Sequence, residues 1–211
     1  MEHFLKISEP VALARPRGAH RLEVFSPKLS RRMIFFRRAQ LDQWILLEAD
    51  PAVITFCERP GYVVVGDERR LADFWVRFSD RQELVILSDI EAENLPVATH
   101  RDLDAAALPV RTVGSAEIAA AQVWIDNWQR MLPYIVANRD LISAPLSRSI
   151  ERFLAHPRRL LEVEREFATG DPVLVRAALF ALLHAGKVNA PDLYTQPLSL
   201  LTTFLVEGAL P

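Results

Sequence analysis

Four short runs of β-forming residues lie between positions 53 and 87, and they constrain the fold of this 211-residue chain more than any other feature. The runs cover residues 53–57, 62–65, 71–78 and 83–87. Turn-forming residues such as Pro60-Gly61 separate them. The last run contains four consecutive aliphatic residues at 84–87, which is typical of a strand covered on both faces. A further run at 108–113 follows a polar stretch, so we expect a sheet with elements packed on both of its faces.

Helical periodicity lies on either side of these runs. A stripe at helical spacing within residues 33–49 is formed by Phe36, Gln40, Trp44 and Leu47. Asp50-Pro51 ends this pattern, because the residue before a proline is pushed out of the α region. A second helix is expected from Ser115, a good N-cap residue, to about residue 132. The fold class is therefore α/β (α+β), with a mixed sheet flanked by helices.

The last third of the chain has a different pattern. Residues 146–187 are almost entirely helical in character, and residues 188–206 contain two short strands around a proline-framed loop. Three helices followed by a two-stranded wing form a winged-helix pattern. We place the boundary near residue 140. The expected divisions are a basic N-terminal arm at 1–30, a mixed-sheet domain at 31–140 and a winged-helix-like domain at 141–211.

Several classes of protein do not fit the sequence. A single cysteine, Cys57, allows no intramolecular disulfide and no cysteine-rich zinc module. The chain contains no glycine-rich dinucleotide loop, no Walker motif and no Gly-x-Ser-x-Gly elbow. Residues 1–10 lack the apolar core of a signal peptide, and no stretch approaches the length of a membrane span. We expect a cytoplasmic protein that has no contact with a membrane.

Charge is unevenly distributed along the chain. Residues 1–40 carry a formal charge of +6, whereas the whole chain carries −2. Such an asymmetry indicates a polyanionic partner, although a solvated arm without a partner gives the same pattern. Two arginine pairs flank the start of the first expected helix, namely Arg31, Arg32, Arg37 and Arg38. We predict that they contact DNA phosphates, with a solvated helix end as the alternative.

Residues 40–88 contain short patterns in a distinctive order. They are the helix segment that ends in Glu48-Ala-Asp-Pro51, the run that ends at Pro60, the triplet Ala72-Asp73-Phe74 and the strand at 84–88. This order resembles the N-terminal nuclease domain of TnsA-family subunits of heteromeric transposases, and the similarity of pattern extends over roughly residues 20–206. The resemblance implies a restriction-endonuclease-like core followed by a winged-helix domain. It also implies DNA and a transposase subunit as partners.

The family chemistry needs a divalent metal, held by clustered carboxylates beside a lysine. By this resemblance the helix glutamate falls on Gln40, the aspartate on Asp73, the strand acid on Ile86 and the lysine on Ser88. Asp73 is the one retained residue of the four. We therefore expect a degenerate centre without a cofactor. Gln40 lies on the stripe that faces the sheet, where a neutral amide is less costly than a carboxylate, although a surface glutamine is the alternative.

Two other functions remain open from the sequence. The first is an active, magnesium-dependent DNA endonuclease with rearranged ligands, of which Asp73 and Asp89 are the best candidates and Glu83 requires a bulged strand. The second is a winged-helix DNA-binding regulator. The candidate recognition helix at 172–185 has one full charge, Arg176, and the segment from Pro145 onward is neutral overall. We therefore favour docking to a protein for this segment, with Arg176 as its candidate DNA contact. The sequence does not predict an oligomeric state.

Overall fold

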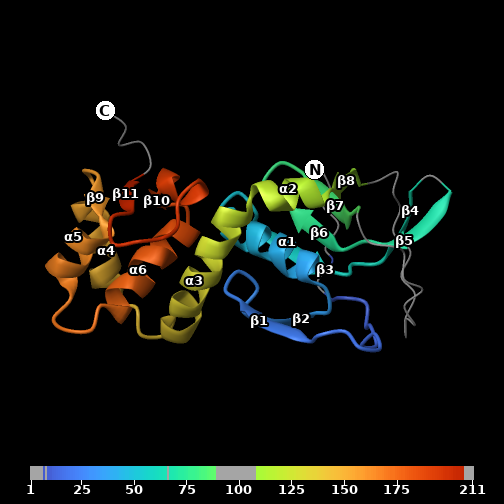
Figure 1. The fold of residues 1–211 in the computed structure, drawn as a ribbon, viewed down its shortest axis with the longest axis horizontal. Coiled ribbons are helices and arrows are strands. Elements are labelled where there is room, and N and C mark those ends of the chain that lie inside the picture. The colour runs from blue at the N-terminus through green and yellow to red at the C-terminus, as the bar shows by residue number, and fades with distance from the viewer. Residues whose placement is uncertain (1–6, 8, 66, 89–107, 207–211) are drawn as a thin grey trace. The chain divides into compact units, whose positions relative to one another are not determined.

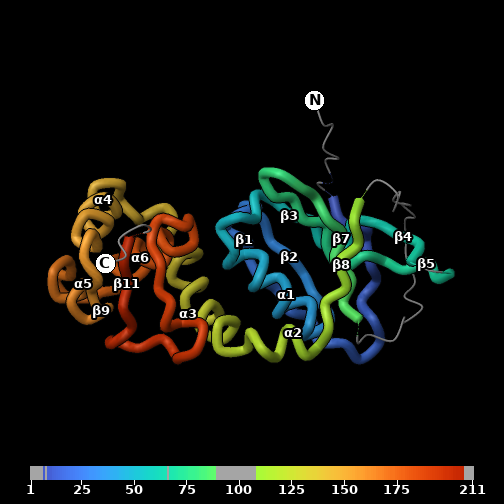
Figure 2. Tube along the Cα trace, turned by 90° about the horizontal axis from the view of Figure 1, so that it is seen from above, coloured from blue at the N-terminus to red at the C-terminus, as the bar shows by residue number. Residues whose placement is uncertain are grey.

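The computed structural model describes residue 7 and residues 9–65, 67–88 and 108–206, and divides into two compact units. The first unit consists of residues 1–47 and 52–119, and the second of residues 48–51 and 120–211. Figures 1 and 2 trace the two units from blue to red along the chain. The fold mixes helices with several sheets, which confirms the α/β (α+β) class at this level.

A four-stranded mixed sheet forms the centre of the first unit. Its strands are β3 (Thr55–Glu58), β6 (Phe74–Arg77), β7 (Gln82–Leu87) and β8 (Val110–Val113), in that order across the sheet. The first two pairings are antiparallel and β7 pairs with β8 in parallel. Residues 84–87 of β7 are all buried, as their unbroken apolar pattern predicts. The sheet is therefore of the mixed kind expected from the sequence.

The two faces of this sheet have separate cores. On one face, Trp75 and Ile86 belong to a buried cluster that also contains Cys57 and Leu84. The neighbouring residue Phe74 points to the opposite face, because side chains alternate along a strand. There its ring lies 6.0 Å from that of Phe35, which in turn lies 6.2 Å from the ring of Trp44 in helix α1 (Arg38–Ala49). Helix α1 is thus linked to the sheet through aromatic side chains.

The first helix begins later than its periodicity predicts. Residues 33–35 of the expected helix belong instead to strand β2 (Arg31–Phe35), which pairs with β1 (Leu22–Ser26) as an antiparallel hairpin. Met33 and Phe35 are buried at alternate positions of β2. The apolar run at 33–36 is compatible with both periods, so pairing with β1 decided between them. This hairpin also lies partly within the segment expected to be an N-terminal arm.

The run expected at residues 71–78 is also two elements. Strand β5 (Glu68–Leu71) pairs with β4 (Tyr62–Val65) in a separate hairpin, and β6 begins at Phe74. Ala72 and Asp73 lie in the break between β5 and β6. Because Asp73 is outside a regular strand, its side chain does not have to follow the alternation of side chains between the two faces of the sheet.

The helix expected at 115–132 is likewise divided between the units. Helix α2 (Ser115–Ala120) ends before Ala121, and α3 (Gln122–Asn138) follows and contains Pro133. The second unit continues with α4 (Ala144–Phe153), β9 (Arg158–Arg159), α5 (Leu160–Phe167), α6 (Val173–His184), β10 (Val188–Asn189), the short 3-10 helix η1 (Pro191–Tyr194) and β11 (Thr203–Val206). Its three strands are antiparallel in the order β10, β11, β9.

Helix α6 is the buried centre of the second unit. Seven of its residues are buried: Val175, Ala177, Ala178, Leu179, Phe180, Leu182 and Leu183. Helix α3 packs against it, with the Tyr134 ring 5.7 Å from that of Phe180. Gly186 ends α6 with a φ of 70°, and the amide of Lys187 donates to the carbonyl of Leu182 at 3.0 Å. A glycine in this left-handed conformation is a common way for a helix to end.

Candidate functional site

The backbone around Asp73 holds this residue between two strands. Its amide donates to the carbonyl of Val85 in β7 at 2.9 Å, and its carbonyl accepts from the amide of Arg59 at 2.8 Å. The side chain of Asp73 is 5% exposed. A carboxylate buried this far needs hydrogen bonds or a cation to offset its desolvation.

The Asp73 carboxylate has three donors around it. Oδ1 accepts from Nη2 of Arg37 at 2.5 Å and from Nε2 of Gln40 at 3.0 Å. Oδ2 accepts from the backbone amide of Leu87 at 2.9 Å. Arg37 precedes α1 and Gln40 lies in its first turn, so the start of this helix positions both side chains. A guanidinium therefore supplies the positive charge at the carboxylate that the family pattern assigns to a metal.

Gln40 is 7% exposed and its amide faces the carboxylate. The alternative interpretation of a surface glutamine is therefore wrong. A glutamate here would lie within hydrogen-bonding distance of a second buried carboxylate, which is unfavourable without a divalent ion between them. The neutral amide avoids this repulsion and donates a hydrogen bond instead.

The other two aligned positions have different surroundings. Ile86 is 2% exposed and belongs to the Trp75 face of the sheet. Ser88 follows β7, where its backbone amide donates to the carbonyl of Val113 at 2.9 Å and its Oγ donates to the same atom at 3.4 Å. Of the four aligned positions, the structure thus brings Gln40 and Asp73 into direct contact.

Two other acidic residues, Glu83 and Asp89, are the candidates for replacement metal ligands. Glu83 is near the start of β7, where it lies 3.9 Å from Arg81 and 4.0 Å from Arg111. Asp89 lies outside the described residues. Within the described ranges, no group of three or more His, Cys, Asp or Glu side chains could hold a metal ion. The donors around Asp73 are cationic or neutral N–H groups, and this set does not fit a magnesium ion, which needs oxygen ligands.

A second buried carboxylate was missed by the sequence analysis. Glu58 at the end of β3 is 2% exposed, and Arg31 donates to both of its oxygens, from Nη1 to Oε1 at 2.8 Å. The hydrogen bond to Glu58 raises the pKa of Arg31. Burial lowers the pKa of the neighbouring Arg59, whose Nη2 lies 3.8 Å from Glu58. The available signal was an acid next to an arginine at the end of a buried strand.

The arginines predicted to contact DNA have intramolecular partners in most cases. Arg31 and Arg37 pair with Glu58 and Asp73, as described above. Arg38 lies 2.8 Å from Asp42 one helical turn later, whereas Arg32 is exposed on β2. In the second unit, Nε of Arg176 donates to Glu164 at 2.6 Å and Nη1 donates to the hydroxyl of Tyr134 at 3.2 Å. The hydrogen bond to Glu164 raises the pKa of Arg176.

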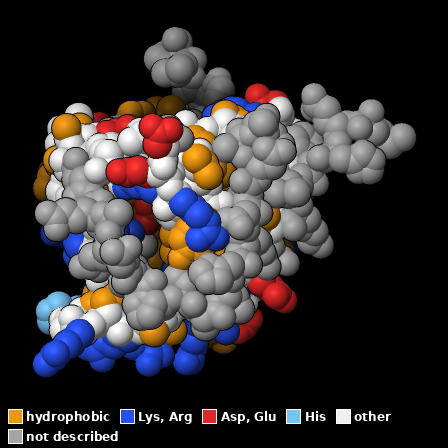
Figure 3. All heavy atoms as spheres, turned by 90° about the vertical axis from the view of Figure 1, so that its right-hand side faces the viewer, with side chains coloured by type: hydrophobic (Ala, Val, Ile, Leu, Met, Phe, Trp, Pro, Cys, Tyr) orange, Lys and Arg blue, Asp and Glu red, His pale blue; other side chains and the backbone are white. Residues whose placement is uncertain are grey.

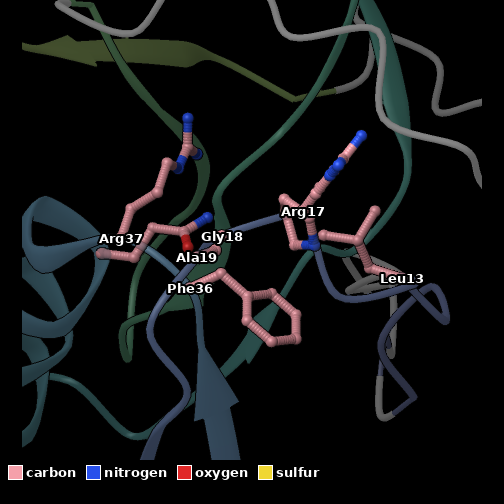
Figure 4. Close-up of a pocket in the computed structure, with 8 residues that line it drawn as sticks. Leu13, Arg17, Gly18, Ala19, Phe36 and Arg37 are labelled. Atoms are coloured by element: carbon pink, nitrogen blue, oxygen red, sulfur yellow. The ribbon is translucent and has the colours of Figure 1, made fainter.

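A cavity of about 280 Å³ lies next to the Asp73 centre, and we call it the arginine pocket. The residues of its lining that matter here are Leu13, Arg17, Gly18, Phe36, Arg37 and Gln40. In Figure 4, Arg17 and Arg37 stand on either side of the Phe36 ring. Figure 3 shows Lys and Arg side chains gathered along the lower edge of one face of the molecule. The site therefore combines two guanidinium groups with an aromatic surface.

The described helices and the comparisons with other proteins give no independent indication of function. None of the helices in the described ranges is both long and apolar enough to cross a lipid bilayer. No protein-family model matches this chain, and comparison with curated protein sequences finds no significant match. The function therefore has to be argued from the geometry of the site.

Proposed function

We propose that this chain is a catalytically inactive, TnsA-like subunit of a DNA transposition complex, which binds DNA and a partner transposase without cutting DNA itself. The observation that carries the proposal is the saturation of Asp73 by Arg37, Gln40 and the amide of Leu87. Each carboxylate oxygen that a metal would need already accepts a hydrogen bond.

The order of elements in the first unit supports the nuclease-like part of the proposal. Helix α1 precedes β3, β6 and β7, which pair in antiparallel fashion, and β8 then pairs in parallel with β7. Asp73 directly precedes β6 and Ile86 lies on β7, the same relative order as in the family pattern. A restriction-endonuclease-like core is the reading that accounts for both the topology and the position of Asp73.

The loss of cleavage follows from charge. Hydrolysis of a phosphodiester by such a centre requires a divalent ion that activates water and neutralises the developing phosphate charge. Arg37 brings one positive charge to Asp73 but, unlike a divalent ion, it does not turn a bound water into a nucleophile, and Ile86 and Ser88 offer neither a second carboxylate nor a lysine. A phosphate held by Arg37 would be bound and oriented without an activated nucleophile.

The second unit supports docking to a protein over independent recognition of DNA. Its helices α4, α5 and α6 with the sheet order β10, β11, β9 are arranged in the sequence typical of a winged helix. A recognition helix has to present polar side chains to a groove. Helix α6 instead buries most of its surface, and its one arginine is held by Glu164. We therefore assign DNA contact to the first unit and partner contact to the second.

A nicking assay tests the absence of catalysis. Supercoiled plasmid is incubated with the full chain and either magnesium or manganese, alongside Asp73→Ala and the control Asp80→Ala, which removes an exposed carboxylate. The expected result is no cleavage above background with any of the three proteins. Cleavage by the wild type and by Asp80→Ala that disappears in Asp73→Ala would overturn the proposal and establish an active endonuclease.

The genes next to the coding sequence test the assignment to a transposition complex. A transposase gene beside it, and retention of that transposase on the purified chain, would support the assignment. If the neighbouring transposase bound equally well to a chain whose second unit had been unfolded by Phe180→Asp, the assignment of partner contact to that unit would be wrong. Phe180 is fully buried, so an aspartate there disrupts the core of that unit.

A further inference from the structure

The arginine pocket shares Arg37 and Gln40 with the inactive centre, but the contacts that hold Asp73 leave the cavity itself without a role. We propose that it binds one nucleotide of single-stranded DNA, with the phosphate between Arg17 and Arg37 and the base against the ring of Phe36. This inference rests on the proposed function, because it names the form of DNA that the first unit holds.

The two arginines have donors to offer to a phosphate. A guanidinium carries five N–H donors, and Arg37 uses Nη2 for Asp73. Arg17 is exposed, and no ion pair joins it to another of the described residues. Arginine is well suited to phosphate because its planar fork matches the spacing of the oxygens. Arg37 therefore keeps donors for a phosphate while its pair with Asp73 stays intact.

The charge around the pocket favours an anion. The Asp73 charge is offset by Arg37, and the Glu58 charge by Arg31 and Arg59. Arg17 adds a further positive charge without an acid beside it among the described lining residues. Helix α1 has no acidic residue in its first turn, so the positive end of its dipole adds to the same field. The buried carboxylates therefore do not repel a phosphate at this position.

A tight turn holds Arg17 in place. The amide of Ala19 donates to the carbonyl of Pro16 at 3.1 Å, which closes a turn over residues 16–19. Gly18 has a φ of 78°, a conformation for which glycine is favoured in a turn. Nε of Arg15 donates to the carbonyl of Ala19 at 2.9 Å and braces the turn. Arg17 is thus presented from a fixed backbone, which lowers the entropy lost on binding.

The aromatic ring indicates a single strand. Bases of a duplex hide their flat faces in the stack, whereas an unpaired base can stack on an aromatic side chain. Phe36 lines the pocket between the two arginines, and the volume of about 280 Å³ lies just below the usual range of small-molecule sites, which leaves room for no more than one nucleotide. A double helix is too wide to enter such a pocket and would meet only its rim.

Fluorescence anisotropy at several salt concentrations tests the proposal. The probes are a short fluorescein-labelled oligothymidylate, the matching oligouridylate and a duplex of equal length, all in EDTA. For Arg17→Ala we expect weaker binding of the oligothymidylate and a salt slope smaller by about 0.7, the value for one lost phosphate contact on a single strand. Arg17→Lys keeps the charge and should keep most of the slope.

Phe36→Leu separates stacking from charge. We expect about tenfold weaker binding with an unchanged salt slope, because the ring contacts a base and not a phosphate. Arg148→Ala in α4 is the matched control, since it also removes one exposed arginine and should alter neither quantity. Circular dichroism and thermal melting confirm that each variant is folded. If Phe36→Leu fails to fold, the exposed Arg17 variants still decide the phosphate contact.

Three results would overturn the proposal. They are wild-type affinity and slope in Arg17→Ala, tighter binding of the duplex than of the oligothymidylate, or tighter binding of the oligouridylate. The EDTA in the assay separates this test from that of the proposed function. If the chain nicks DNA in the presence of metal but Arg17→Ala shows the expected loss of affinity and salt slope, only the proposed absence of catalysis is wrong. If the chain does not nick DNA and Arg17→Ala binds like the wild type, only the proposed binding of a single strand in the arginine pocket is wrong.

Discussion

The guanidinium of Arg37 and the carboxylate of Asp73 form a mostly buried ion pair, with Nη2 2.5 Å from Oδ1. Arg37 reaches this carboxylate from the segment just before α1, and Asp73 meets it from the break before β6. Their pairing fixes the start of α1 against the end of the sheet at which β6 begins. It also places one guanidinium between a buried acid and the arginine pocket, so the same side chain can serve stability and binding.

Removal of the charge on Asp73 should destabilise the first unit. Asp73→Asn leaves the guanidinium of Arg37 without its anion and places an amide among three donors. We expect the free energy of unfolding to fall by about 2 kcal/mol, less than for a fully buried pair because Arg37 is partly exposed. Urea denaturation measures the change. Asp80→Asn, at an exposed pair with Arg81, should change it by less than about 0.5 kcal/mol, and equal effects of the two variants would contradict the assignment.

Arg176 should contribute to stability and not to DNA binding. Its guanidinium is held by Glu164 and by the hydroxyl of Tyr134, and the hydrogen bond to Glu164 raises its pKa, so Arg176 stays charged in the folded protein. Arg176→Ala should lower the free energy of unfolding by about 1 kcal/mol. DNA affinity measured by anisotropy should stay within about twofold of the wild type. A clear loss of DNA affinity at unchanged stability would restore α6 as a DNA-contacting helix.

Asn127 should be among the most sensitive positions of the second unit. It is 1% exposed, and its Nδ2 donates to the carbonyls of Leu193 and Gln196, both at 2.8 Å. Its Oδ1 accepts from the amide of Leu198 at 2.7 Å. Asn127→Ala leaves three backbone groups without these partners and should cost about 3 kcal/mol.

Asn127→Asp sharpens this test because it keeps the size of the side chain. A carboxylate would face two carbonyl oxygens in place of the amide donors, so this variant should be less stable than Asn127→Ala. Thermal unfolding followed by circular dichroism gives the order. Gln122, whose side chain makes an exposed hydrogen bond to Asp126 at the start of the same helix, supplies the control Gln122→Ala. Wild-type stability in both Asn127 variants would show that the three hydrogen bonds of this side chain contribute nothing to the free energy of unfolding.

Tyr194 should make stability depend on pH in alkaline solution. Its ring stacks on Trp124 with centroids 4.1 Å apart, and partial burial raises its pKa, with a smaller contribution from Asp50. Tyrosine in the unfolded chain ionises near its ordinary pKa of about 10. Above that pH the unfolded state binds fewer protons than the folded state, so stability is lost as pH rises toward the folded pKa.

Comparison with Tyr194→Phe isolates this effect. The difference in urea midpoint between the wild type and Tyr194→Phe should be constant below the ordinary tyrosine pKa and should shift against the wild type above it. The phenylalanine variant keeps the stacked ring and removes the titrating hydroxyl. A difference that stays constant through the alkaline range would contradict the raised pKa.

Much of the first unit could be predicted from local patterns. The runs near 53–57, 62–65, 83–87 and 108–113 all became strands, and the unbroken apolar run of β7 indicated its burial. Such patterns are informative because burial on one or two faces of an element makes apolar residues recur at the period of that element. The start of the first helix was misplaced because the apolar run at 33–36 satisfies both periods.

The candidate site could be predicted only in part. Gln40 and Asp73 were identified by their place in a pattern, and the structure brings them within 3.0 Å. Neither the partner of Glu58 nor the arginine pocket was found, because each joins segments that are far apart in the chain. Glu58 of β3 meets Arg31 of β2, and the pocket combines the turn at 16–19 with the start of α1. A buried acid in a strand looks the same in a sequence whether it faces a metal, an arginine or water.

The sequence alone determined the α/β class, the positions of most helices and strands, and the asymmetry of charge in residues 1–40. These properties depend on neighbours in the chain, whose spacing the sequence displays directly. Only the tertiary structure decided that Arg37 neutralises Asp73, because 36 positions separate the two residues in the chain. The packing of α3 on α6 in the second unit was decided in the same way. Such pairings depend on which buried surfaces and charges meet after folding, and local periodicity carries no record of them.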